Sequence, residues 1–172
     1  MPKARHFINP TRQCGGQRHH TIMSYTTSYY HIVLRTYRSE KTIPIEHERK
    51  LYTYIYGIAN NLRCQVYRIG GMPDHIHIFA SLPSFLSIAA FVQRIKTDSS
   101  KWLKTHPDFP RFRGWGRGYA AFSYSIRDKD MIVGYIMKQK EHHHKKTFTE
   151  EYRAFVVENG ITIDERFFLS DM

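Results

Sequence analysis

The chain has 172 residues and a mass of 20.5 kDa, and its 26 Lys and Arg against 15 Asp and Glu give a net charge of +11. Its two cysteines, Cys14 and Cys64, exclude a disulfide framework and a CxxC zinc module, and they suit a reducing compartment. So large a positive surplus favours a polyanionic partner, with nucleic acid ahead of a membrane surface.

The first 22 residues are basic, rich in histidine and without apolar periodicity. We expect them to form a flexible or solvated extension ahead of a single domain over residues 23–172, with Met23 as an alternative start. No apolar run in the sequence has the length of a signal peptide or a membrane span. We therefore expect a soluble, cytoplasmic protein with no membrane partner.

Four segments in the first half of the chain have clear patterns. Residues 28–35 (SYYHIVLR) are rich in β-branched and aromatic side chains and predict a strand. After Pro44, apolar residues at helical spacing predict a helix of roughly four turns. These residues are Leu51, Ile55, Ile58 and Leu62. Residues 65–69 predict a short strand closed by Gly70 and Gly71, and residues 74–81 (DHIHIFAS) predict another strand between two prolines.

The second half continues this alternation. Ser87 is the predicted cap of a helix with a regular apolar face. That face carries Ile88, Phe91, Val92, Ile95 and Leu103. Residues 105–118 read as a loop of Pro, Gly, Arg and aromatics, and residues 119–126 (YAAFSYSI) predict a fourth strand. Asp128 is the predicted cap of a helix that runs to about residue 143, and residues 148–158 predict a last helix.

The order β-α-β-β-α-β followed by helices predicts an α+β, ferredoxin-like (split βαβ) fold. We expect a four-stranded antiparallel sheet with helices on one face and an additional C-terminal helix that bears a tyrosine. In this topology the first and third strands are central. The polar residues of the DHIHIF strand would then lie in the middle of the sheet and need a function.

His75 and His77 are the polar residues in question. Residues i and i+2 of a strand share one face, so the two imidazoles project side by side and can hold one divalent metal. Spacing and placement leave a metal site and a pair of structural histidines equally open. His142 and His144 have the same spacing, but on a helix they point to nearly opposite sides.

Met131, Tyr135 and Gln139 follow one another at intervals of four on the predicted helix after Asp128, so they share a stripe. Tyr135 could be a nucleophile and Gln139 a metal ligand if this helix packs over the His75 and His77 face. Without a metal or a basic neighbourhood the phenol is a poor nucleophile. An amphipathic helix with a packed tyrosine is the competing interpretation.

Basic residues suited to a polynucleotide are found in two places. Lys96 and Lys101 lie on the predicted second helix and could contact the phosphate backbone. The loop after that helix interleaves guanidinium groups, aromatics and glycine, a composition that suits phosphates and stacked bases. Its candidates are Arg111, Arg113, Trp115 and Arg117. A solvated helix face and a connecting loop packed through Trp115 would explain the same residues.

Several segments together carry a family resemblance. They are SYYHIVLRT, GGMPDHIHIFASLP, FVQRIKTDSSKWL, GYAAFSYS and YIMKQKEHHHKKTF. In this order and spacing the chain from Met23 onward resembles the single-tyrosine HUH transposases of small, hairpin-recognising bacterial insertion sequences. Residues 1–22 lie outside the resemblance.

The resemblance implies that His75 and His77 are the HUH pair, that Gln139 is the third metal ligand and that Tyr135 is the DNA nucleophile. It implies a transposase that depends on Mg²⁺ or Mn²⁺ and cleaves and rejoins single-stranded DNA at hairpin ends through a 5′-phosphotyrosine intermediate. It also implies a homodimer in which the tyrosine helix of one subunit can serve the histidines of the other. The expected location is the nucleoid of a bacterial cell.

Two other functions remain open from the sequence. One is a non-catalytic nucleic-acid-binding module on the same ferredoxin-like scaffold, although the chain lacks the aromatic series of RNA-recognition modules on its central strands. The other is a domesticated, repeat-associated tyrosine nuclease that nicks hairpins without moving an element.

Overall fold

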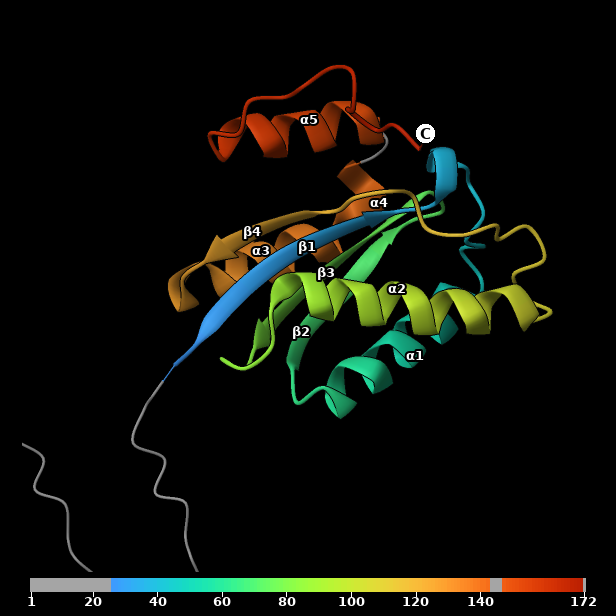
Figure 1. The fold of residues 1–172 in the computed structure, drawn as a ribbon, viewed down its shortest axis with the longest axis horizontal. Coiled ribbons are helices and arrows are strands. Elements are labelled where there is room, and N and C mark those ends of the chain that lie inside the picture. Colours follow the sequence, from blue (N-terminus) through green and yellow to red (C-terminus); the bar gives the residue numbers. More distant parts are fainter. Residues whose placement is uncertain (1–25, 143–146, 172) are drawn as a thin grey trace, which may run out of the picture.

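The computed structural model describes residues 26–142 and 147–171, which form one antiparallel sheet covered by helices on both faces (Figure 1). The sheet has the order β2-β3-β1-β4. Its strands are β1 (Ser28–Arg35), β2 (Gln65–Met72), β3 (His75–Leu82) and β4 (Ala120–Tyr124). The predicted fold is confirmed, and β1 and β3 are the central strands.

The first face of the sheet is covered by α1 (Glu48–Asn61) and α2 (Ile88–Thr105). The main hydrophobic core lies here, because alternate residues of β1 and β3, such as Ile32 and Ile78, point toward the apolar faces of both helices. Ser87 caps α2 as predicted, and its side chain accepts a hydrogen bond from the Ala90 amide at 3.1 Å.

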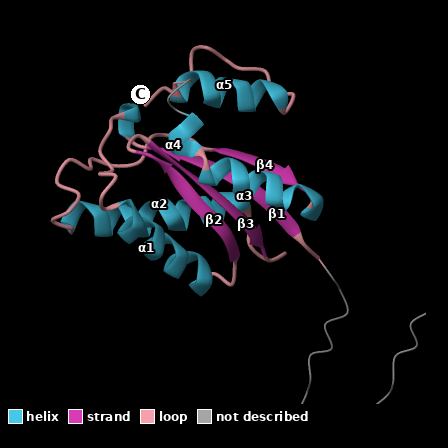
Figure 2. Ribbon diagram, turned by 180° about the vertical axis from the view of Figure 1, so that it is seen from behind, coloured by secondary structure: helices cyan, strands magenta, loops and turns pink. Residues whose placement is uncertain are grey.

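The second face carries α3 (Lys129–Met137), α4 (Gln139–His142) and α5 (Phe148–Glu158). Viewed from behind, α3 lies over the sheet, and α5 lies at the top of the view, above α4 and β4 (Figure 2). Ile132 and Ile136 of α3 pack on Phe79, whereas Phe148 of α5 packs with Val33 of β1. None of the helices in the described part of the chain is both long and apolar enough to cross a bilayer.

Gly70 and Gly71 do not close β2 as predicted but lie within it, paired with His77 and Ile76 of β3. The reason is steric. A Cβ on Gly70 would lie 2.9 Å from the Ile136 side chain, and one on Gly71 would lie 2.3 Å from the His75 carbonyl oxygen. Gly70 therefore allows α3 to approach the sheet beside the histidines, and Gly71 allows β2 to lie close to the backbone of β3.

The region after β4 also differs from prediction. β4 is shorter than residues 119–126 and leads into a 3₁₀ helix, η2 (Ile126–Asp128). The predicted cap residue Asp128 belongs to that turn, where its carboxylate accepts hydrogen bonds from the amide and hydroxyl of Ser125. Ser125 in turn caps η2. The chain enters α3 directly from η2, so Asp128 gives α3 no side-chain cap.

The single predicted helix over residues 128–143 is divided at Lys138, and its residue 143 lies outside the described residues. The Lys138 amide bonds to the carbonyls of both Gly134 and Tyr135, which tightens the last turn of α3. The three residues expected on one stripe of this helix consequently differ in their burial. Met131 is exposed and Tyr135 is half-buried, whereas Gln139 is buried under α5.

Candidate active site

The second face of the sheet places His75 and His77 side by side at its centre. In β3 they alternate with Ile76 and Ile78, which enter the main core. Antiparallel pairing sets Val33 of β1 opposite His77. Both histidines are fully buried beneath the helices of this face. The sequence therefore correctly predicted their shared face and central position.

His75 is oriented by a carboxylate on one side. Its Nδ1 lies 2.6 Å from Asp74 Oδ1, so Nδ1 carries the ring proton and donates a hydrogen bond to the carboxylate. The other nitrogen, Nε2, lies 3.5 Å from Gln139 Oε1 and 3.7 Å from a carboxylate oxygen of Glu151. The Nε2 atom of His75 thus lies near two side-chain oxygens, and the bond from its Nδ1–H to a carboxylate is typical of a metal-ligating histidine.

His77 is oriented by a second histidine that the sequence analysis did not single out. Its Nδ1 lies 2.9 Å from Nε2 of His31, a fully buried residue of β1. Burial lowers the pKa of His31 to about 4, so its ring is neutral at physiological pH. A neutral His31 can accept a hydrogen bond from the Nδ1–H group of His77, which leaves Nε2 of His77 as the ligand nitrogen.

Glu151 of α5 completes this cluster. A nitrogen from each of His75 and His77 and a carboxylate oxygen of Glu151 all lie within 4.8 Å of one another. Gln139 Nε2 donates to Glu151 Oε1 at 3.0 Å, which turns the Gln139 amide oxygen toward His75. Burial, together with the nearby charge of Asp74, raises the pKa of Glu151 to about 8.

These donors fit a divalent cation. Two imidazole nitrogens and one or two side-chain oxygens, in a buried position with oriented rings, are a ligand set that can hold a divalent metal ion. The sequence offers one signal for Glu151. It follows Phe148 by three positions and precedes Phe155 by four, so its carboxylate lies on the apolar face of the helix, where a charged group is unusual. Nothing in the sequence indicates that this helix face meets the histidines.

Tyr135 reaches the same cluster from α3. Its ring centroid lies 5.9 Å from that of His77 and 6.1 Å from that of His31, in edge-on arrangements. Because α3 packs on the sheet of its own chain, one subunit brings Tyr135, Gln139 and both histidines together.

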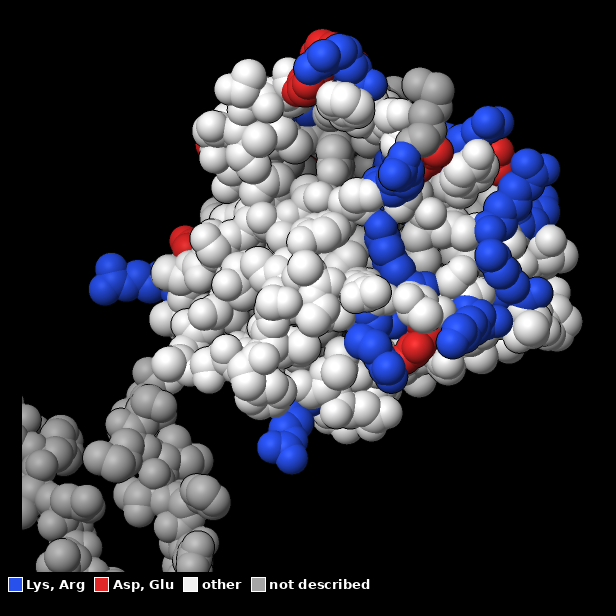
Figure 3. Space-filling model, viewed as in Figure 1, with Lys and Arg blue, Asp and Glu red and all other residues white. Residues whose placement is uncertain are grey.

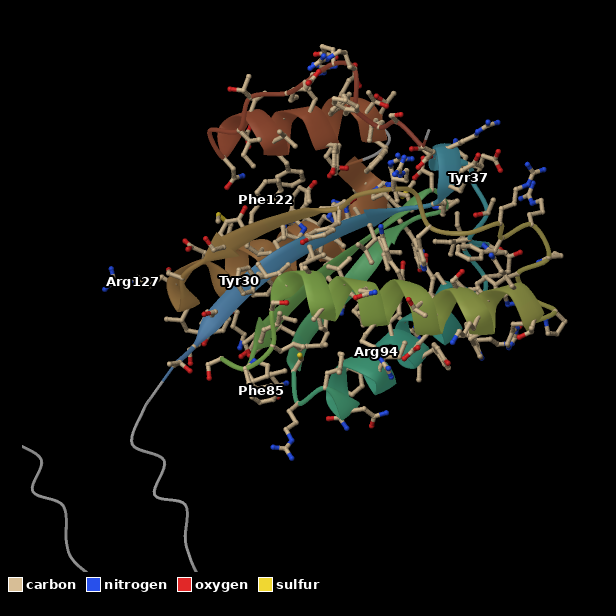
Figure 4. All side chains as sticks on the ribbon, viewed as in Figure 1. Tyr30, Tyr37, Phe85, Arg94, Phe122 and Arg127 are labelled. Carbon is tan, nitrogen blue, oxygen red and sulfur yellow. The ribbon has the colours of Figure 1, made fainter. Side chains whose placement is uncertain are left out.

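The helix α5 closes the site. Phe148 stacks on His75 with a centroid separation of 4.3 Å, and Phe155 meets Tyr135 edge-on at 5.3 Å. Phe155 also packs against Phe122 of β4, which lies below α5 (Figure 4). Phe148 and Phe155 thus contribute to the complete burial of His75 and His77.

The predicted DNA-contacting residues fall into two groups. Lys96 and Trp115 have internal partners: Lys96 donates to the carbonyl of Gly116 at 2.8 Å, and Trp115 donates to the Ser99 hydroxyl at 2.9 Å. They hold the loop after α2 in place. The side chains of the other predicted contacts are exposed. These are Lys101, Arg111, Arg113 and Arg117.

Lys and Arg side chains gather over α2, the loop that follows it and the turn after β1, while the opposite end of this view is largely uncharged (Figure 3). The predicted contact residues therefore belong to a basic end of the molecule. Their role in binding DNA stays a prediction.

Comparison with known proteins gives two kinds of match. The family model described as "Transposase IS200 like" matches residues 24–139. A crystal structure from Deinococcus radiodurans R1, provisionally described as a transposase, has 20% identity and a TM-score of 0.51 over 74% of this chain and 98% of that chain. The structure of a REP-associated tyrosine transposase bound to a REP hairpin has 15% identity and a TM-score of 0.50 over 87% of this chain and 89% of that chain. No curated protein matches at a significant level.

Proposed function

The chain belongs to the IS200-like transposase family, and from this premise we propose that it cleaves and rejoins single-stranded DNA with Tyr135 as nucleophile and a metal held by His75 and His77. The proposal is carried by one observation: the Tyr135 ring lies against His77 in the buried cluster. Membership of a transposase family implies DNA strand transfer, and Tyr135 brings to the cluster a hydroxyl group that can attack phosphorus.

In this mechanism the Tyr135 oxygen attacks the scissile phosphorus in line with the leaving 3′ oxygen. The bond between phosphorus and the 3′ oxygen breaks as the phosphotyrosine bond forms. The phenol loses its proton and the leaving oxygen gains one, which gives a free 3′-hydroxyl. Attack by a 3′-hydroxyl of another strand reverses the step and rejoins DNA without an external energy source.

The metal ligands we propose are His75, His77 and Gln139. Asp74 and His31 orient the two imidazoles, and Glu151 orients the Gln139 amide. A bound Mg²⁺ or Mn²⁺ would act as a Lewis acid toward the phosphodiester and offset the charge that develops on it. The chain's own groups keep the ligand nitrogens deprotonated and exclude water from the cluster.

We extend hairpin binding to this chain because a protein of the same fold is bound to a REP hairpin. Tyr135 lies beside the histidines of its own chain, which supports catalysis within one subunit. The homodimer with a shared active site, expected from the resemblance, stays a prediction. A nucleoid location likewise stays one.

A denaturing gel tests the proposal. The protein is incubated with labelled single-stranded DNA that contains an end hairpin of its element, with Mg²⁺ or Mn²⁺ present. We expect a covalent protein–DNA adduct that requires the metal, disappears in Tyr135→Phe and persists in Tyr124→Phe. Tyr124 is the matched control. Its ring centroid lies 6.3 Å from that of His31, about as near as that of Tyr135, but it belongs to β4 and not to the helix that carries the proposed nucleophile. An adduct that persists in Tyr135→Phe would exclude this nucleophile, and no adduct on any hairpin would favour the non-catalytic module.

A further inference from the structure

A carboxylate is held in a cradle of donors at the end of β1. Asp171 Oδ2 accepts from Arg35 Nη1 at 2.6 Å and from the amide of Arg38 at 2.5 Å. Its Oδ1 accepts from Arg35 Nη2 at 2.9 Å and from the amide of Arg117 at 2.7 Å. Each oxygen therefore receives two donors, one of them from the planar fork of a guanidinium group.

The cradle is built into the fold. The side chains of Arg35 and Asp171 are each only 4% exposed. Arg38 and Ser39 have positive φ angles of 55° and 53°, an unfavourable conformation for residues other than glycine, and the amide of Arg38 donates to the carboxylate. A Cβ on Gly116 would lie 2.7 Å from Arg35 Nη1, so a glycine is needed beside the guanidinium group.

The cradle lies next to the proposed active site. Arg35 is the register partner of His75 across β1 and β3, so both side chains lie on the second face of the sheet. Tyr37, in the turn η1 (Tyr37–Ser39), marks this end of the sheet, where the last described residues return (Figure 4). The basic side chains of Figure 3 gather at the same end.

A hollow adjoins the cradle. It is a cavity of about 250 Å³, lined in part by Arg35, Arg117, Tyr119 and Tyr152. Guanidinium groups beside aromatic rings are the combination that binds single-stranded nucleic acid, since the cations meet phosphates and the rings stack on bases. A carboxylate and a phosphodiester both present two anionic oxygens that an arginine fork can bind together.

With the proposed DNA cleavage as the premise, we propose that Arg35 and the amides of Arg38 and Arg117 form a phosphate-binding site for single-stranded DNA beside the metal ligands. Asp171 fills this site in the absence of DNA and is displaced by a phosphodiester. Arg35, on the β-strand next to that of His75, would then hold the DNA that reaches His75. The segment that carries Asp171 would move aside.

Binding of the hairpin oligonucleotide at several salt concentrations tests this site. All proteins carry Tyr135→Phe, so that no cleavage occurs. We expect Asp171→Asn to bind about five- to tenfold more tightly at low salt, because a phosphodiester displaces a neutral amide from the guanidinium fork more easily than it displaces a carboxylate. The matched control is Glu165→Gln, which removes an exposed charge paired with Arg153 and should change affinity less than about twofold.

A second pair of variants identifies the cation. Arg35→Gln in the Asp171→Asn background should abolish the gain, and Arg35→Lys should lose most of it because the planar fork is lost. Melting curves establish that each variant is folded. Equal affinity of Asp171→Asn and its parent for the oligonucleotide, or an equal gain in Glu165→Gln, would overturn the phosphate site.

The two proposals fail differently. A chain with Tyr135 that forms the adduct, but whose binding is insensitive to Asp171→Asn, retains its proposed function and loses only the phosphate site. A chain that binds no hairpin oligonucleotide in any variant loses both.

Discussion

Nε2 of His31 lies 2.9 Å from Nδ1 of His77, which joins the two central strands through a pair of buried imidazoles. Such a partner fixes which nitrogen of a ligand histidine carries the proton, and its loss commonly costs ten- to a hundredfold in metal affinity. His31 is therefore a positioning residue for His77.

We expect His31→Phe to lower the affinity for Mn²⁺ by about tenfold or more, since His77 loses its acceptor. His31→Gln keeps an acceptor oxygen and should restore most of the affinity. Isothermal titration of Mn²⁺ into folded variants measures both. Equal affinity in His31→Phe and the parent would mean that the pair is purely structural.

Two side chains, Gln139 and Glu151, offer an oxygen as the third metal ligand, and single substitutions distinguish them. If Gln139 is the ligand, Gln139→Ala should weaken Mn²⁺ binding more than Glu151→Gln, which keeps an acceptor for the Gln139 amide. Bound metal stabilises the fold by mass action, so the rise in melting temperature with added Mn²⁺ gives a second measure. A larger loss in Glu151→Gln would identify the carboxylate as the ligand instead.

The aromatic contacts of α5 restrict access to the site. Phe155→Ala removes the ring that packs on Tyr135, so α5 should detach more easily. We expect a lower melting temperature and a several-fold faster formation of the DNA adduct. Val157→Ala is the control, because Val157 lies on the exposed side of the same helix. A lower melting temperature with an unchanged rate of adduct formation would contradict gating by α5.

Glycine substitutions test how α3 is positioned. In Gly70→Ala the new methyl group would meet Ile136, 2.9 Å away, and we expect a loss of about 1–3 kcal/mol in the free energy of unfolding. Gly57→Ala in α1 meets no atom within 4 Å and should instead stabilise the protein by about 0.5–1 kcal/mol. Urea denaturation measures both, and a stabilising Gly70→Ala would show that α3 does not depend on close approach.

Local patterns predicted the elements of this fold well, because each depends on residues that are near in sequence. The strand at residues 28–35 and the helix at residues 148–158 are found with the predicted bounds, and His75 and His77 occupy a central strand. The contact between His31 and His77 depends instead on the register between two strands. Periodicity gives no information about that register.

The residues that the sequence missed share this long-range origin. Glu151 meets Gln139 across 12 positions, and Asp171 meets Arg35 across 136 positions. The division of the helix at Lys138 was also missed. The residues at the break include no proline or glycine that would have signalled it in the sequence. The break is instead associated with the packing of Gln139 beneath α5.

The two faces of the sheet are stabilised by separate hydrophobic clusters of very different size. The cluster with α1 and α2 contains most of the buried apolar side chains, whereas the one beneath α5 centres on Val33, Phe122 and Phe148. Local opening costs less free energy where fewer apolar contacts are lost. The helix α5 and the segment after it can thus unfold as a unit while β1, β3 and both early helices stay native. Native-state hydrogen exchange would then show two classes of amide protons, and the fold would survive an opening that exposes the histidines.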